Sequence, residues 1–533
     1  MSPPPNTEPR LARRGLGEVG ALNTVLLLLP ILLFLLVFLK NAWVSEDAYI
    51  MFRSIEQLAA GNGPRWNPHE RVQVFTGPLW FWLLSLFRLA CSDVFLNAIV
   101  ASALLTLATV LVLRLTVGTT PAWAFLLLML VCSKGFFDFT SSGLENPLGY
   151  LLTALYVHYY CRMHAPAPRT RLVPKLLLVL SLTLVCRHDL VTLLAIPTLF
   201  LVIGRWREMK IRTWLAAGLL TLLPLAAWSA FALVYYGSII PNTAYAKLGS
   251  GVNRAALLAQ GWNYFLASFR HDTITFIVLA AVIPASFLAR EKHIRCLGFG
   301  VILNLVYVAA VGGDFMQGRF LSYAYLVAAT CLVLARPRDK ARNLVGALAA
   351  AALVVYAAAY PHVPLKTPLD FTNREMVLGV ADERGHYFDT SSLRQYVTNH
   401  GGECFPAHRW SKEGLALAQS SHVVVEKNTV GYFGYWAGLD KIIVDPLALT
   451  DPLLARLHIA KTTHWRPGHF EREIPEGYIE SLVSGENTIA DPGISEFNER
   501  IKIITRSDNL LTRERIATII AMNLGRYDRY VGQ

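Results

Sequence analysis

Apolar runs long enough to cross a lipid bilayer recur through the first 360 residues of this 533-residue chain. The first, residues 22–40, holds 19 residues and would rise about 28 Å as an α-helix, the thickness of a bilayer core. Hydrophobic residues make up 54% of the chain and charged residues only 16%, the balance of a polytopic membrane protein. Ten further runs follow: 92–113, 119–133, 144–161, 174–186, 190–204, 213–236, 273–289, 296–311, 320–335 and 343–360. The sequence therefore predicts a transmembrane domain over residues 1–360 with about eleven membrane-spanning helices.

The charged residues between these runs predict the topology. Residues 78–90 are apolar but number only 13 and are rich in aromatic residues, which favours a juxtamembrane helix lying at the headgroup level. If that segment does not cross, 19 of the 30 basic residues before position 361 fall on one side, which the positive-inside rule identifies as cytoplasmic. We therefore expect a multi-pass protein of a bacterial inner membrane, surrounded by lipid, with a cytoplasmic N-terminus and a periplasmic C-terminal region.

The composition changes after residue 360. Residues 361–533 contain two runs typical of strands, HVVVEKN and KIIVD, and a predicted helix near 509–523. We interpret this region as a soluble periplasmic domain of mixed α/β structure. The chain carries a net charge of +12, but the whole positive excess lies in the membrane half, where basic residues set orientation, so nucleic acid is not an expected partner. The seven cysteines show no disulfide framework and no CxxC spacing.

The first outer loop, residues 41–77, carries an acidic pair, Glu46 and Asp47, directly after the first apolar run. Tyr49 and Arg53 follow at a spacing that places them on one face of a short helix. A carboxylate at the membrane edge is expensive to place and tends to be functional, for example as a base toward a sugar hydroxyl or as a stabiliser of an oxocarbenium ion. The structural alternative is a helix N-terminus whose dipole the acids offset.

Four more polar clusters fall on the same predicted face. Their candidate residues are Glu145 and Asn146; Arg187, His188 and Asp189; Asn242 and Lys247; and Asp314 and Arg319. Each cluster taken alone is more typical of a helix cap or a structural ion pair, but five on one face favour a working site. Arg187, Lys247 and Arg319 suggest an anion site, because Arg binds phosphate with two donors and Lys supplies a point charge.

Known catalytic motifs are absent from the sequence. There is no HExxH, GxSxG or Walker motif, and the missing Walker motif argues against an ATP-driven pump. His188 is a candidate metal ligand, but a lone histidine is more often a hydrogen-bonded structural residue. We therefore predict no dedicated metal site and no certain cofactor, and leave a divalent cation open.

Taken together, the motifs resemble a known family. They are SEDAYIMFRS, GNGPRWNPHERVQVFTGPLW, SSGLENPL, YYGSIIPNTAYAK, GGDFMQGRFL, GYFGYWAGLDKIIVDPLALTDPLLAR and GHFEREIPEGY. A long first periplasmic loop with an acidic pair resembles the GT-C superfamily of polyprenyl-phosphate-dependent glycosyltransferases, and the finer pattern resembles its membrane arabinofuranosyltransferases. The resemblance implies a donor of decaprenyl-phosphate-arabinofuranose type, a periplasmic active site and a glycan or glycoprotein acceptor.

The resemblance also implies residue roles. The family's loop acid falls on Asp47, the principal catalytic carboxylate, with Glu46 assisting where the family pattern has a second aspartate. Arg187, Lys247 and Arg319 would hold the donor phosphate. The sugar and acceptor pocket would be lined by Tyr49, Arg53, Glu145, Asn146, His188, Asp189, Asn242 and Asp314.

Three other functions compete with this one. Another lipid-linked sugar, such as mannose or aminoarabinose, fits the same site. A transporter or flippase for a lipid-linked sugar predicts inverted repeats and intramembrane charges, and the sequence shows neither. A non-catalytic envelope assembly protein would tolerate the loss of Asp47.

Overall fold

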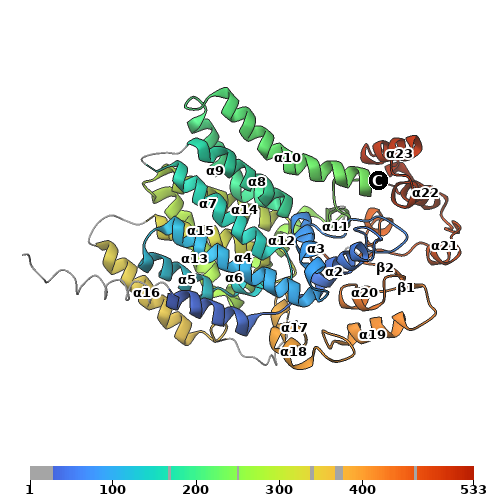
Figure 1. The fold of residues 1–533 in the computed structure, drawn as a ribbon, viewed down its shortest axis with the longest axis horizontal. Coiled ribbons are helices and arrows are strands. Elements are labelled where there is room, and N and C mark those ends of the chain that lie inside the picture. The colour runs from blue at the N-terminus through green and yellow to red at the C-terminus, as the bar shows by residue number, and fades with distance from the viewer. Residues whose placement is uncertain are drawn as a thin grey trace, which may run out of the picture.

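The computed structural model describes residues 28–165, 170–248, 251–335, 341–366, 376–460 and 465–532, and helices dominate it (Figure 1). The membrane-half elements are a helix over Leu28–Asn41, then α2 (Glu46–Ala59), α3 (Pro78–Ala90), α4 (Val94–Val117), α5 (Thr120–Cys132), α6 (Lys134–Phe137), η1 (Asp138–Thr140), α7 (Asn146–Met163), η2 (Thr170–Leu172), α8 (Val173–Cys186), η3 (His188–Leu190), α9 (Val191–Arg205), α10 (Ile211–Tyr236), α11 (Asn242–Leu248), α12 (Arg254–His271), α13 (Thr273–Leu288), α14 (Lys292–Ala310), η4 (Arg319–Leu321), α15 (Ser322–Leu334) and α16 (Ala341–Ala359).

The expectation of a polytopic helical membrane protein is confirmed. Among the described residues, four helices are long and apolar enough to cross a membrane, or up to six if each of two bent pairs forms one span. Shorter apolar helices, including α3, α8 and α15, accompany them. The exact number of eleven spans stays a prediction, and residues 22–27 of the first one lie outside the described part of the chain.

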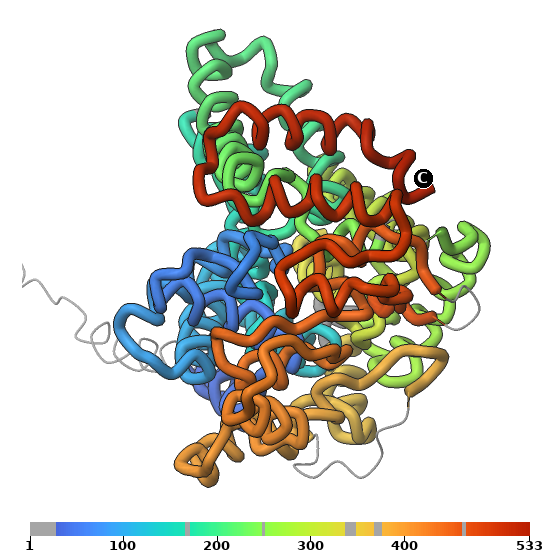
Figure 2. The backbone as a smooth tube through the Cα atoms, turned by 90° about the vertical axis from the view of Figure 1, so that its right-hand side faces the viewer, coloured from blue at the N-terminus to red at the C-terminus, as the bar shows by residue number. Residues whose placement is uncertain are grey.

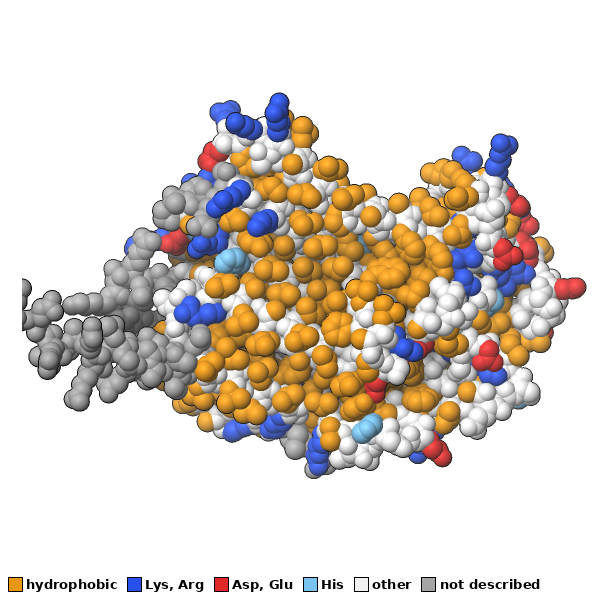
Figure 3. All heavy atoms as spheres, in the orientation of Figure 1, with side chains coloured by type: hydrophobic (Ala, Val, Ile, Leu, Met, Phe, Trp, Pro, Cys, Tyr) orange, Lys and Arg blue, Asp and Glu red, His pale blue; other side chains and the backbone are white. Residues whose placement is uncertain are grey.

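Helix α10 shows why these segments fold as membrane helices. It packs on α8 but leaves a row of leucines exposed, among them Leu215, Leu219 and Leu222. Helices that are apolar nearly all round are stable only in lipid or in a large core. Hydrophobic side chains cover the middle of the molecule, and basic side chains gather toward the end where α9 turns into α10 (Figure 3).

Helix α12 was not predicted, and it packs against the connection between α14 and η4. It meets α13 at a break bent by 119°, so the chain changes direction directly before the predicted span at 273–289. The Tyr264 hydroxyl donates to the Met316 carbonyl at 3.1 Å and accepts from the Phe320 backbone N–H at 3.2 Å. Gly313, at a φ of +71°, lies against the Tyr264 ring, where a Cβ would come within 2.4 Å. Helix α12 therefore shapes the connection that carries Asp314 and Arg319.

The C-terminal region is largely helical rather than evenly mixed. Its elements are α17 (Glu383–Ser391), α18 (Leu393–Asn399), α19 (Arg409–Ala418), β1 (Val424–Glu426), α20 (Tyr432–Trp436), β2 (Ile442–Val444), η5 (Leu454–Arg456), α21 (Tyr478–Ser484), α22 (Pro492–Arg506), α23 (Arg513–Asn523) and η6 (Asp528–Tyr530). The two predicted strand runs do form strands, which pair in parallel with Val424 opposite Ile442. Among the described residues they make the only sheet. The helix expected near 509–523 corresponds to α23.

This region is fastened to the first outer loop and to the helix ends. Figure 2 views the molecule from this end, with the C-terminal segments lying over the first loop. The guanidinium of Arg53 donates to the carbonyls of Trp66, Gly434, Gly438 and Lys441. Arg515 donates to the carbonyls of Val234 and Tyr235 at the end of α10. Backbone hydrogen bonds also join residues 42–44 to 391–393.

Candidate functional site

The acidic pair begins helix α2. Ser45 is the N-cap residue, and Glu46 and Asp47 occupy the first helical turn, where the helix dipole favours negative charge. Glu46 is 8% exposed, and its Oε1 accepts a hydrogen bond from the Tyr432 backbone N–H at 3.0 Å. Burial raises the pKa of Glu46 to about 8, with the Asp47 charge adding to the effect. Glu46 therefore lies against the C-terminal region.

Asp47 is partly exposed and faces several charged side chains. Burial raises its pKa, and the positive charges of Arg319, Lys247 and Arg466 oppose that rise. No hydrogen bond or ion pair of its carboxylate is formed with any residue that the structure describes. We call the set that surrounds it the charged cluster: Asp47, Lys247, Asp314, Arg319, Glu383 and Arg466.

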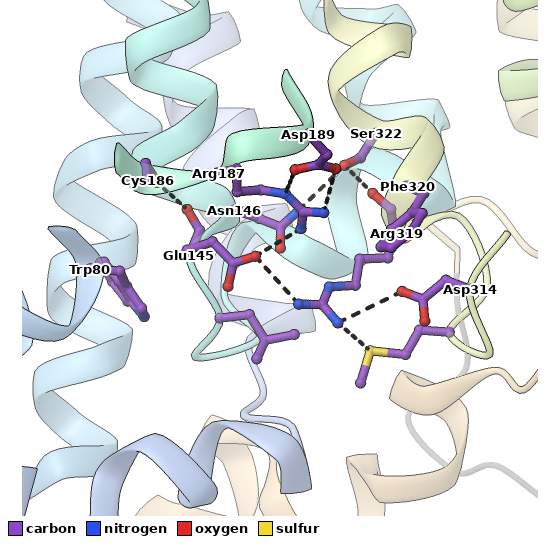
Figure 4. A network of polar contacts seen from close by, with 12 residues as sticks. Trp80, Glu145, Asn146, Cys186, Arg187, Asp189, Asp314, Arg319, Phe320 and Ser322 are labelled. Carbon is purple, nitrogen blue, oxygen red and sulfur yellow. Dashed lines mark hydrogen bonds and ion pairs between the residues drawn. The ribbon is translucent and has the colours of Figure 1, made fainter. Parts of the chain in front are cut away.

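A buried ion-pair network backs the charged cluster (Figure 4). Glu145 Oε1 accepts from Arg187 Nη1 at 2.8 Å and from Arg319 Nη2 at 3.3 Å. Asp189 binds Arg187 with both carboxylate oxygens, at 2.9 and 2.7 Å. Asp314 Oδ2 lies 3.7 Å from Arg319 Nη1. One glutamate thus bridges two arginines that come from connections far apart in the sequence.

The three predicted phosphate ligands differ in how far this network already pairs them with carboxylates. Arg187 is held by two carboxylates and lies over the rings of Phe320 and Tyr323. Arg319 is held less tightly, and its buried Nε has no hydrogen-bond partner. Lys247 is exposed and packs near Gly468, where a Cβ would lie 3.5 Å from Nζ. Of the three predicted phosphate ligands, Lys247 and Arg319 are therefore the two whose charges act on Asp47, and Arg319 is also paired with Glu145 and Asp314.

Several predicted pocket residues instead hold the fold together. Arg53 is fully buried with its donors on backbone carbonyls. Tyr49 is 1% exposed and packs edge-on against Tyr432 and Tyr435. The Asn242 side chain donates to the carbonyls of residues 448, 449 and 451. Asn146 is fully buried in the first turn of α7 and donates to Ser322 Oγ at 3.4 Å.

The other predicted pocket residues differ in the same way. His188 is exposed at the start of η3, while its neighbours on either side are paired with each other. Among the described residues, the ion pairs of Asp189 and Glu145 are with Arg187 and Arg319. Asp314 belongs to the charged cluster itself.

Two members of the charged cluster escaped the sequence analysis. Glu383 and Arg466 both come from the C-terminal region, and both are partly exposed. Arg466 lies over the ring of Phe315, 5.3 Å from its centroid, next to Asp314. The only sequence signal was that Arg466 lies two residues before the GHFEREIPEGY motif, which begins at Gly468; nothing marked Glu383.

Metal ligation was tested on the described residues. Among them, no group of three or more His, Cys, Asp or Glu side chains has an arrangement that could hold a metal ion. The charged cluster contains three carboxylates and three cations, so its formal charges balance.

Two curated relatives match this chain, both named terminal β-(1→2)-arabinofuranosyltransferase. The *Mycobacterium tuberculosis* protein is 24% identical over 83% of this chain and 82% of its own length. The *Corynebacterium glutamicum* protein is 29% identical over 52% of this chain and 46% of its own length. This chain is a homologue of arabinofuranosyltransferases. The resemblance expected from the motifs is thereby confirmed, and the chain is a glycosyltransferase homologue with a multi-pass membrane fold.

Other comparisons add less. No protein-family model matches the chain. Among solved structures, ArnT from *Cupriavidus metallidurans* bound to undecaprenyl phosphate is similar with a TM-score of 0.48 and 12% identity, covering 79% of this chain and 86% of that one. An *Archaeoglobus fulgidus* oligosaccharyltransferase is similar with a TM-score of 0.45 and 12% identity, covering 80% and 64%.

Proposed function

We propose that this protein transfers arabinofuranose from a polyprenyl-phosphate donor, of the decaprenyl-phosphate-arabinose type, to a glycan or glycoprotein acceptor outside the inner membrane. The relationship to two arabinofuranosyltransferases supports the reaction class. The observation that carries the site is the Asp47 carboxylate, which is unpaired among the described residues and faces three cations. A lipid phosphate would be the anion that Lys247 and Arg319 bind beside Asp47.

The proposed chemistry divides between cations and carboxylates. Lys247 and Arg319 would bind the donor phosphate and stabilise the charge that develops on it as the bond to the sugar breaks. Asp47 would lie against the sugar carbon that becomes positively charged. Glu46 would assist from the same helical turn. Arg187 would position Arg319 through the shared Glu145 carboxylate.

The donor needs no further activation, because the sugar–phosphate bond is itself the energy source. An enzyme of this kind works in detergent, whereas a flippase needs a closed membrane to show net transport. Transfer by purified protein in micelles, from a panel of arabinose, mannose and aminoarabinose lipid phosphates, therefore separates the proposed function from its alternatives.

The catalytic assignment is tested by Asp47→Asn. We expect transfer to fall by about 100-fold or more, the usual effect of removing a charged catalytic group, with the protein still folded and inserted. The matched control is Asp508→Asn, because Asp508 is exposed in the C-terminal region, away from the charged cluster. Near-normal transfer by the Asp47 variant would overturn the assignment.

A further inference from the structure

Residues 381–391 of the C-terminal region are hydrogen-bonded to two other parts of the chain. One is the loop that carries Asp314, and the other is the segment directly before Asp47. At the start of this range, the Ala381 N–H donates to the Phe315 carbonyl at 2.7 Å, and the Gln317 N–H donates to the Ala381 carbonyl at 3.0 Å. At its end, the Val44 N–H donates to the Ser391 carbonyl at 3.1 Å. Helix α17 lies between these two attachments, so its first residue, Glu383, is held between the loops that contribute the charged cluster.

A third attachment fixes the start of α17. The Asp382 carboxylate caps the helix by accepting from the Gly385 N–H at 2.9 Å, and the same oxygen accepts from Lys134 Nζ at 2.9 Å. Lys134 is 4% exposed and also pairs with Asp138. The backbone of Glu383 is therefore anchored to the membrane bundle by a buried ion pair one residue away.

The Glu383 side chain itself is left unengaged. It is partly exposed, and it forms no hydrogen bond or ion pair with any residue in the described ranges. The charges that act on it are those of Asp47, Glu46, Arg466 and Asp314. Three of these four neighbours are carboxylates, so the carboxylate of Glu383 is placed where holding a proton is favoured.

Glu383 and its three carboxylate neighbours have different surroundings. Glu46 is bound to a backbone N–H, Asp314 is buried near Arg319, and Asp47 faces the cations. Burial and the charges of Asp47 and Glu46 raise the pKa of Glu383 well above its usual value. Glu383 accepts a proton only in its ionised form, so a raised pKa makes that form, and the rate it supports, increase with pH.

We propose that Glu383 is the general base that takes the proton of the acceptor hydroxyl. The inference rests on the proposed function and adds to it a residue from the C-terminal region. In the transfer step, the bond between the sugar carbon and the phosphate oxygen breaks, and its electron pair leaves with the phosphate toward Lys247 and Arg319. The acceptor oxygen forms the new bond to that carbon, and its proton passes to Glu383. Asp47 then stabilises the positive charge that develops on the sugar carbon, and it is not needed as the base.

A purely structural role predicts different behaviour. A glutamate in the first turn of a helix is stabilised by the helix dipole, and its loss would lower stability without moving the pH dependence of the reaction. The pH profile of kcat is therefore the readout that separates the two roles.

The test compares Glu383→Gln, Glu383→Asp and the unaltered protein in detergent, with a polyprenyl-phosphate-arabinofuranose donor and an arabinan oligosaccharide acceptor. Glu480→Gln is the matched control, because Glu480 is an exposed glutamate in the first turn of another C-terminal helix, α21. We expect Glu383→Gln to lower kcat by about 100-fold, to leave donor binding unchanged and to abolish the rise of kcat with pH on its acidic side. Glu383→Asp, which keeps the charge but withdraws the carboxylate, should recover part of the rate and part of the pH dependence.

Failure of the inference is distinct from failure of the proposed function. If the unaltered protein transfers a different sugar, the proposed donor is wrong, and the Glu383 variants are then measured with the sugar it does transfer. If the Glu383→Gln variant keeps the rate and pH profile of the unaltered protein, the proton acceptor is another group. If that variant does not fold, Glu383→Asp decides: an unchanged melting temperature with a lowered kcat supports the inference, and an unchanged kcat overturns it.

Discussion

Glu145 offers the sharpest test of how the site is built, because one carboxylate oxygen bridges two buried arginines. The side chains of Glu145, Arg187 and Arg319 are 6%, 8% and 11% exposed. Glu145→Gln keeps the shape but removes the charge, which leaves Arg187 with Asp189 and Arg319 with Asp314 at only 3.7 Å. Breaking a buried ion pair by removing one partner costs about 3–5 kcal/mol. Since both arginines keep a second carboxylate, we expect about 3 kcal/mol.

The assay is thermal unfolding of the purified protein in detergent, with Glu480→Gln as the control for loss of an exposed glutamate. The melting temperature should fall by several degrees, and a second variant, Arg319→Gln, measured alone and combined with Glu145→Gln, gives the coupling between the two residues. We expect the double variant to lose clearly less stability than the sum of the single variants. A melting temperature for Glu145→Gln within one degree of the unaltered protein, or strict additivity, would refute the view that this network holds Arg319 in place.

Two further predictions concern the same region. Burial raises the pKa of Glu46 from 4.5 to about 8, so the folded state binds this proton more tightly than the unfolded state, and the stability that the proton contributes is lost as pH rises from about 4.5 to 8. Glu46→Gln should therefore match the unaltered protein at pH 4 and melt at a higher temperature than it at pH 8. The reverse order at pH 8 would contradict the assignment. Gly318 has a φ of +75°, and an added Cβ would lie 2.5 Å from the Cα of Gly135. Gly318→Ala should therefore lower the free energy of unfolding by roughly 1–3 kcal/mol and reduce transfer by shifting Arg319. A melting curve and a donor titration measure the two effects, and an unchanged melting temperature together with unchanged donor affinity would exclude a close fit at this position.

The helices of the membrane half were largely predictable because lipid imposes a strong signal on sequence. Residues 78–90 were expected to form a short interfacial helix, and α3 covers Pro78–Ala90. Helix α12 was missed because its sequence mixes Arg254, Gln260 and Asn263 with leucines and aromatic residues, so no apolar run marked it. A helix that lies across the bundle and packs one face on a loop carries no length or hydropathy signal of its own.

The site was predictable only in part, because the sequence shows which residues are polar but not which of them pair. Asp47 and Arg319 were chosen for their predicted side of the membrane, and the structure brings them together. Arg187 was chosen by the same reasoning, yet Asp189 two residues later and Glu145 from another connection already occupy its guanidinium. Arg53 lies on the same helix as Asp47, α2, but its donors bind backbone carbonyls away from the charged cluster. Local spacing could not distinguish these cases.

The sequence predicts a soluble domain that begins at residue 361, where the composition changes, and hydrogen bonds join this region to the membrane half. The backbone of residues 42–44, directly before Glu46 and Asp47, is hydrogen-bonded to residues 391–393. The position of the acidic pair therefore depends on a segment more than 300 residues later in the chain. The same segment presents Glu383 to the pair, and a neighbouring loop presents Arg466. The change in composition at residue 360 therefore does not mark where the charged cluster ends.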